Sequence, residues 1–211
     1  MDCMDAMREF PDGYFDLSLV DPPYGIGIDK AMNANKGKQG FKLYNKTDWD
    51  STPPDKCYFK EIMRVSKNQI IWGANYFVDN LIPSQGWIVW NKVQRDFTMS
   101  DAELAYTSFD RTIRCFDLSR GGAMGDANKH GSKIHPTQKP VKLYEWIYMN
   151  YLPNGGKVLD THLGSGSNRI AADKMGNIEF YGYEIDKEYF DASVKRFETY
   201  KSQGVLEFPM E

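Results

Sequence analysis

The segment with the clearest chemical potential in this 211-residue sequence is Asp21-Pro22-Pro23-Tyr24. It ends the apolar and β-branched run 15–20, which predicts a buried strand. Two consecutive prolines lack backbone N–H groups and fix φ, so neither a helix nor a central strand continues through them. The sequence therefore predicts a stiff loop at the carboxyl end of a strand. Its carboxylate, carbonyl oxygens and aromatic ring could hold a planar amino group.

A second group of residues follows the strand-like run 157–159, which leads through a glycine-containing loop into a helix-like segment. The loop contains Asp160, His162, Gly164, Ser165 and Gly166. A strand, a glycine-rich turn and a helix bring backbone N–H groups close to a ligand. Glu184 ends the next strand-like run, where a carboxylate commonly binds the ribose hydroxyls of an adenosine cofactor. The alternative is that Glu184 caps the following helix.

The place of Asp160, ahead of the glycines, departs from the pattern that binds nicotinamide dinucleotides. An acid at this position would repel a pyrophosphate but could hold an ammonium group. S-Adenosyl-L-methionine carries both required groups, a ribose for Glu184 and an α-amino group for Asp160. The residues therefore favour this cofactor over a dinucleotide.

The segment 135–140, His-Pro-Thr-Gln-Lys-Pro, directly precedes the helix-like run 141–151. Pro140 suits the first helical turn and Thr137 could cap the helix, which is a purely structural explanation for these two residues. It does not explain Lys139, because a cation at a helix start is unfavourable unless an anion lies nearby. A cofactor carboxylate is one candidate for that anion.

Helix-like and strand-like segments alternate along the chain. The helix-like segments are 4–9, 54–66, 75–81, 141–151, 168–175 and 187–202, and the strand-like runs are 16–20, 69–72, 87–90, 103–107, 112–116, 157–159 and 178–183. This alternation predicts an α/β fold, a Rossmann-like doubly wound, mostly parallel sheet in a single domain, residues 1–211. The runs from 87 to 116 have no helices between them, which predicts an antiparallel edge.

Composition narrows the class of protein. A hydrophobic share of 41% and a charged share of 26% are ordinary for a soluble globular protein. The sequence has no apolar run of membrane-spanning length and no signal-like start, so we expect a cytoplasmic protein with no membrane association. Three widely spaced cysteines suit reduced thiols and predict neither a metal site nor a disulfide framework.

Positive charge gathers in two segments although the net charge of the chain is −3. Residues 111–142 hold seven Lys or Arg against two Asp, and residues 30–60 hold seven Lys against three acids. Their irregular parts, 26–53 and 117–133, flank the candidate chemical residues, and loops this long are commonly functional. A run of charge is often only a solvated face, but this placement favours contact with phosphates.

Together the three segments resemble motifs of the amino-directed DNA methyltransferases, which act on adenine N6 or cytosine N4. Asp21-Pro22-Pro23-Tyr24 matches the DPPY motif of this family, and the run 160–167 resembles its cofactor loop. Glu184 matches the ribose-binding acid, and segment 135–140 is similar to the stretch upstream of the loop. The catalytic motif precedes the cofactor motif, as in the circularly permuted β subgroup, and segments 72–77 and 87–92 resemble small, often phage-borne members.

The resemblance implies a class I methyltransferase fold, S-adenosyl-L-methionine as the cofactor and double-stranded DNA as the substrate. Asp21 and the carbonyl of Pro22 are then expected to accept the amino hydrogens of a flipped adenine, with Pro23 stiffening the loop and Tyr24 stacking on the base. Asp2 and Cys3 resemble the segment that contacts the cofactor adenine. The alternatives are a cytosine-N4 enzyme and a catalytically inactive subunit that binds cofactor and DNA.

The cofactor loop departs from the family pattern at two positions. Thr161 and His162 stand where the family usually has Pro and Phe, so His162 is expected to stack on the cofactor in place of Phe, or cofactor affinity to fall. In the family a strand precedes the segment that Asp2 and Cys3 resemble, and segment 205–208 could supply that strand here.

The resemblance also suggests a homodimer, a role in restriction-modification, and the cytoplasm of a bacterium or a phage-infected host. Segments 26–53 and 117–133 are the candidates for DNA recognition, and they are short for reading many base pairs.

Overall fold

The computed structural model describes residues 1–27, 50–95, 99–130, 133–135 and 137–203. Most of segment 26–53, together with Pro136 and segment 205–208, lies outside the described residues. The helices are α1 (Cys3–Arg8), α3 (Lys56–Val65), α4 (Arg120–Lys129), α5 (Val141–Tyr151), α6 (Ser167–Met175) and α7 (Lys187–Ser202). The strands are β1 (Leu17–Val20), β2 (Gln69–Trp72), β3 (Trp87–Asn91), β4 (Ala102–Thr107), β5 (Arg114–Asp117), β6 (Gly156–Asp160) and β7 (Ile178–Gly182).

These strands form one sheet in the order β5-β3-β4-β2-β1-β6-β7. β4 runs antiparallel to both of its neighbours, β2 and β3, and every other neighbouring pair is parallel. The predicted α/β sheet with an antiparallel part toward one edge is confirmed. β5, the outermost strand on that side, pairs parallel with β3, so the reversal belongs to β4.

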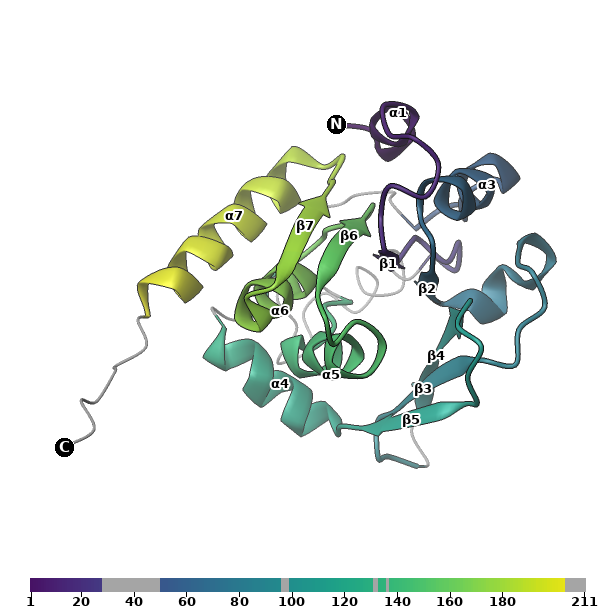
Figure 1. Ribbon diagram of the computed structural model, residues 1–211. Helices are drawn as coiled ribbons and strands as arrows, with labels where there is room; N and C mark the ends of the chain where they lie inside the picture. The colour runs from purple at the N-terminus through teal and green to yellow at the C-terminus, as the bar shows by residue number, and fades with distance from the viewer. Residues whose placement is uncertain (28–49, 96–98, 131–132, 136, 204–211) are drawn as a thin grey trace.

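Helices cover both faces of the sheet because alternate residues of each central strand point to opposite sides. Leu19 of β1 belongs to a buried cluster with α5 and α6, whereas Val20 packs with residues of α1 and α3. Figure 1 shows α1 and α3 together at the upper right of the sheet, and α4 to α7 toward the left and bottom. The result is the three-layer arrangement expected of a doubly wound fold.

The two crossovers beside the centre of the sheet lie on opposite faces. β1 connects to β2 through α3, and β6 connects to β7 through α6, on the other face (Figure 1). Adjacent β1 and β6 therefore form a switch point, where ligands of open α/β sheets bind beyond the carboxyl ends of the strands. Asp21 follows β1 directly and Asp160 ends β6, so the topology brings these two predicted site residues to one crevice.

Two sequence-based predictions of local structure were wrong. Segment 117–133 was expected to lack regular structure, but residues 120–129 form α4. Three glycines lower its helix propensity, and tertiary contacts compensate: Ser119 caps the helix, and Asp126 accepts a hydrogen bond from the backbone N–H of Val141. The expected helix 75–81 is instead two short 3₁₀ turns, Ala74–Tyr76 and Val78–Asn80.

Two further features concern composition. Within the described part of the chain, no helix combines the length and apolarity needed to cross a bilayer.

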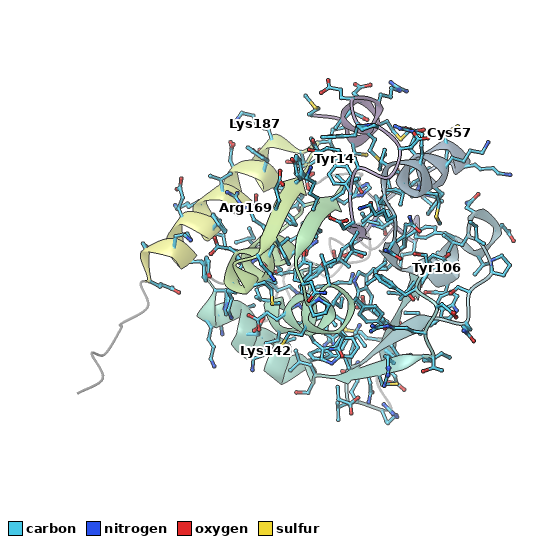
Figure 2. The ribbon with its side chains drawn as sticks, in the orientation of Figure 1. Tyr14, Cys57, Tyr106, Lys142, Arg169 and Lys187 are labelled. Carbon is cyan, nitrogen blue, oxygen red and sulfur yellow. The ribbon has the colours of Figure 1, made fainter. Side chains whose placement is uncertain are left out.

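Cys57 and Cys115 are free and exposed, and Figure 2 shows Cys57 on the outer side of α3. Cys3 is free and half-buried at the start of α1.

The central strand β2 provides a test of the core. Ile70 is fully buried between β1 and β4, and its truncation to Ala should lower the free energy of unfolding by about 2–5 kcal/mol. Ile82→Ala is the matched control, because Ile82 is 62% exposed. Urea denaturation of both variants measures the difference, and equal losses for the two would contradict this assignment of the core.

Candidate active site

The loop after β1 is held by a buried carboxylate. Asp50 Oδ1 accepts hydrogen bonds from the backbone N–H groups of Tyr24 at 2.8 Å and Gly25 at 2.9 Å. Asp50 is almost fully buried, so these bonds are shielded from water. The Pro22-Pro23 pair stiffens the chain just upstream, and the loop therefore has a fixed path out of β1.

Asp21 lies in a group of buried charges. Its Oδ2 is 2.5 Å from Nζ of Lys139, and its Oδ1 accepts a hydrogen bond of 2.8 Å from the hydroxyl of Tyr24. Lys139 Nζ also lies 3.3 Å from Oε2 of Glu103 and donates to the Tyr24 hydroxyl at 3.1 Å. Asp21 is thus oriented by two donors while keeping free lone pairs on both oxygens.

The charges in this group stabilise one another. Burial raises the pKa of Asp21 above its usual value, and the Lys139 ammonium opposes that rise. Burial alone would lower the pKa of Lys139, but Asp21 and Glu103 outweigh it and the pKa is raised. Lys139 is therefore a cation at neutral pH.

These contacts revise the prediction made for Lys139. The anion that its position required is present in the protein, as Asp21 and Glu103. The structure therefore removes the reason for assigning Lys139 to a cofactor carboxylate, although Lys139 does line the cavity described below.

The Tyr24 ring is packed on several sides. Tyr76 stacks on it with ring centroids 5.2 Å apart and planes tilted by 20°. Gly73, at φ +68°, lies so close that a Cβ atom there would be 2.0 Å from Cε1 of Tyr24. Tyr76 is itself 47% exposed, so a base that stacks on this face of Tyr24 must displace Tyr76.

Asp160 is buried at the end of β6. Its Oδ1 accepts from the backbone N–H of His162 at 3.1 Å, and its Oδ2 accepts from Nδ2 of Asn168 at 2.9 Å. Burial raises the pKa of Asp160 to about 7, against the effect of these hydrogen bonds. Its carboxyl group is thus poised between its neutral and charged forms near neutral pH.

The glycine loop turns from β6 into α6. Gly166 takes φ +70° at the N-terminal cap of α6, a conformation that favours glycine. The buried Arg196 of α7 fixes the loop by donating to the carbonyl of Ser165 at 2.7 Å. Glu184, just after β7, also fixes it, because Oε2 of Glu184 accepts from the N–H of Gly164 at 2.8 Å. Glu184 Oε1 also accepts from the N–H of Asp186, but Asp186 itself caps α7, so the alternative that Glu184 caps this helix was wrong.

A cavity of about 220 Å³ joins these parts. Asp21, Pro23 and Lys139 line one side, and Gly164, Ser165 and Glu184 line another; the remaining lining residues are His135, Thr137, Gln138, Tyr144, His162, Leu163, Ser167, Ile185, Asp186 and Tyr189. Asp160 is buried and does not line the cavity, but it accepts a hydrogen bond from His162, which does. A second cavity of about 260 Å³ opens at the opposite end of the sheet, beside Asp16 and Gly155, away from the predicted site residues.

Of the other predicted cofactor residues, His162 lines the cavity and Asp2 and Cys3 do not. Asp2 caps α1 by accepting from the N–H of Met4, and Cys3 follows it; neither lines the cavity. His162 lines the cavity, and its ring makes an edge contact with the Tyr58 ring, with the two ring centroids 5.5 Å apart. Burial lowers the pKa of His162 to about 4, so the ring is neutral at pH 7 and suited to apolar contact.

The cavity fits an adenosine cofactor that carries an amino acid. Glu184 offers a carboxylate to ribose hydroxyls, and the next residue, Ile185, is an apolar side chain that is 75% exposed and could cover an adenine ring. The buried carboxyl of Asp160 and the amides at the start of α6 suit the two ends of an amino acid. The residues present therefore match this cofactor.

Several residues of the site were not predicted from the sequence. Glu103 joins through the reversed strand β4, Asp50 through a loop, and Asn168 through the first turn of α6. The sequence carries no signal for the first two. Asn168 directly follows the glycine loop, and its proximity to Asp160 is the signal that could have found it.

Comparison with solved structures identifies the fold. The M1.HpyAVI–SAM complex matches with a TM-score of 0.58 and 19% identity, covering 92% of this chain and 96% of that one. The PvuII DNA methyltransferase, described as cytosine-N4-specific, matches with a TM-score of 0.57 and 15% identity, covering 93% and 84%. The fold is that of the class I methyltransferases, as predicted.

Sequence similarity defines the family. Residues 59–195 match the N6/N4 DNA methylase family model. The type II methyltransferase M2.DpnII of Streptococcus pneumoniae is 28% identical over 87% of this chain and 82% of its own length, and M.HinfI of Haemophilus influenzae is 24% identical over 95% and 67%. The chain belongs to the N6/N4 DNA methylase family. The predictions of DNA methylation and of S-adenosyl-L-methionine as the cofactor are confirmed.

Gly73 provides a test of how Tyr24 is held. In Gly73→Ala the new methyl group would overlap the Tyr24 ring at a strained φ, so we expect a loss of about 1–3 kcal/mol in stability and a fall in DNA methylation rate. Gly125→Ala in α4 is the control, because a Cβ there meets nothing within 4 Å. Thermal unfolding and a methylation assay check both; an unchanged Gly73→Ala protein would contradict the packing of Tyr24.

Proposed function

We propose that this protein transfers the methyl group of S-adenosyl-L-methionine to the exocyclic N6 amino group of adenine in double-stranded DNA. The observation that supports the proposal is the shared cavity, which is lined by Asp21 together with Gly164 and Glu184. Family membership supplies the reaction class, and the resemblance of segment 21–24 to the DPPY motif favours adenine.

The exocyclic nitrogen of adenine is a poor nucleophile because its lone pair is delocalised into the ring. Asp21 and the carbonyl of Pro22 accept its two hydrogens, which directs the lone pair away from the ring plane. The cofactor, when bound, supplies an electrophilic methyl group. The protein contributes positioning and a nearby negative charge for a nitrogen that becomes positive. Asp21, directly or through water, accepts the surplus proton.

The target base reaches this cavity only when it leaves the duplex, because the site lies below the protein surface. Tyr24 is the proposed stacking partner. In the unliganded protein Tyr76 covers one face of the Tyr24 ring, so entry of the base on that side exchanges one aromatic contact for another. This exchange lowers the cost of opening the pocket.

Two alternatives are distinguished by product analysis. Cytosine N4 is the nearer one, supported by the likeness to a solved enzyme described as cytosine-N4-specific. The other is an inactive subunit, which the departures at Thr161 and His162 keep open. Incubation with labelled cofactor and DNA, followed by digestion to nucleosides, should yield N6-methyladenine. N4-methylcytosine, or no labelled nucleoside, would contradict the proposal.

Finer features also belong to this proposal. The order of catalytic strand before cofactor strand supports placement in the permuted β subgroup, and segments 72–77 and 87–92 support a likeness to its small, often phage-borne members. Segments 26–53 and 117–133 are the proposed DNA-recognition segments of the single domain 1–211. Positive charge gathers at the second of these segments: burial lowers the pKa of Lys133, and the nearby charges of Arg120 and Lys92 lower it further. A homodimer and a cytoplasmic place in a restriction-modification system are proposed from the resemblance alone.

Asp21→Ala tests the catalytic role. The change removes an acceptor for the amino hydrogens, so the methylation rate should fall by roughly 100-fold or more while cofactor affinity stays within about twofold. Single-turnover methylation and titration with S-adenosyl-L-methionine measure the two quantities. Near-normal turnover in Asp21→Ala would disprove the assignment, and a thermal melt excludes misfolding as the cause of a loss.

Asp160 predicts a pH dependence of cofactor binding. Its pKa is raised to about 7, so below this pH the carboxyl is neutral and holds an ammonium group poorly. Affinity for S-adenosyl-L-methionine should therefore rise between pH 5.5 and 7.5, by up to about tenfold per unit below the pKa. His162 and His135, with pKa values lowered to about 4 and 3, stay neutral over this range.

Calorimetric titration of the wild type and of Asp160→Asn measures this effect. The variant cannot ionise at this position, so its affinity should be lower at pH 7.5 and nearly flat with pH. A flat profile in the wild type would contradict the role given to Asp160.

A further inference from the structure

The reversed strand β4 brings a carboxylate to the catalytic edge of the sheet. Because β4 runs antiparallel to β2 and β3, its first residues lie beside the last residues of those strands. Glu103 is paired with Trp90 near the end of β3, one residue after the start of β4. A parallel strand in this place would put its own start at the far end of the sheet.

Glu103 is the third of four alternating charges, which follow one another in the order Asp21, Lys139, Glu103 and Lys92. Lys139 Nζ lies 2.5 Å from Asp21 and 3.3 Å from Glu103, and Lys92 Nζ lies 2.7 Å from the other oxygen of Glu103. The Lys139 side chain is only 2% exposed, whereas those of Glu103 and Lys92 are 24% and 16% exposed. Asp21 is 20% exposed, so Lys139 is the most buried of the four groups and is enclosed between two partly exposed carboxylates.

All three donors of the Lys139 ammonium have acceptors: Asp21, Glu103 and the hydroxyl of Tyr24. The Lys139 ammonium also lies 5.3 Å from the ring centroid of Trp72. Its position is therefore fixed, and Glu103 shares its charge with Asp21. Without Glu103 the whole charge would fall on Asp21, and the carboxylate would become a weaker acceptor for an incoming amino group.

We propose that Glu103 is a positioning residue for methyl transfer, holding Lys139 between two carboxylates so that Asp21 stays oriented and keeps its negative charge available to the target amino group. Lys92 supports Glu103 by pairing with its other carboxylate oxygen. This inference rests on the proposed function of Asp21.

The charges that face Asp21 come from every element around it. Lys139 and Glu103 act directly, and Tyr24 hydrogen-bonds to it from the same loop. Asp160 of β6 and the hydroxyls of Tyr58 in α3 and Tyr144 in α5 lie near enough to interact electrostatically. Glu103 raises the pKa of Asp21, in addition to the larger effect of burial, so removing the charge of Glu103 should lower that pKa.

The test is Glu103→Gln, which keeps the shape of the side chain and removes its charge. We expect the single-turnover methylation rate to fall roughly tenfold, the acid limb of its pH profile to move to lower pH, and cofactor affinity to stay within about twofold. Carboxyl ¹³C NMR titration of the unliganded protein, with the Asp21 signal assigned from Asp21→Asn, should show a lowered Asp21 pKa. Glu103→Asp, which retains the charge, should recover part of the rate and guards against loss of folding in Glu103→Gln.

Asp101→Asn is the matched control, because Asp101 is exposed two residues earlier and its loss changes the net charge equally. It should leave the rate and the Asp21 pKa unchanged. An unchanged rate and pH profile in Glu103→Gln would overturn the inference, and so would weakened cofactor binding with a normal rate, since Lys139 would then serve the cofactor. Absence of methylation by the wild type would instead overturn the proposed function.

Discussion

The buried ion pair between Lys139 and Asp21 is the constraint on which this active site depends. Taking both charges out of water is costly, and the pair is favourable only because the groups are close and further bonded by Glu103 and Tyr24. Breaking such a pair typically costs about 3–5 kcal/mol, so chain segments more than a hundred residues apart are held together at this point. As a result, the loop after β1 and the segment before α5 have fixed positions relative to each other.

The carboxylate on the cofactor side of the cavity has electrostatic surroundings that differ from those of Asp21. Within the part of the chain that the structure describes, Asp160 forms no ion pair; it accepts hydrogen bonds from the backbone N–H of His162 and from Asn168, so burial dominates and its pKa rises. Asp21 is compensated by one protein cation, Lys139, whereas in the proposed function Asp160 pairs with the ammonium group of the cofactor. Two carboxylates at neighbouring strand ends thereby acquire different roles from their surroundings.

Much of this arrangement could be predicted from the sequence, because Asp21, Asp160 and Glu184 each lie at or just after the carboxyl end of a strand and topology places these ends together. The function of Lys139 could not, because its partners come from distant β1 and β4. Helix α4 could not be predicted for a related reason. Its glycines oppose helix formation, and the hydrogen bond that stabilises it joins Asp126 of α4 to the backbone N–H of Val141 in α5. Local patterns identify the residues that end strands, whereas pairing between elements requires the three-dimensional structure.

The most direct test is a crystal structure of the protein bound to S-adenosyl-L-homocysteine, the product of methyl transfer. We predict that the ribose contacts Glu184, that the amino acid end lies near Asp160, that the sulfur faces Asp21, and that Lys139 remains paired with Asp21 and Glu103. A cofactor bound outside this cavity, or Lys139 turned away from Asp21 to the cofactor carboxylate, would contradict this account.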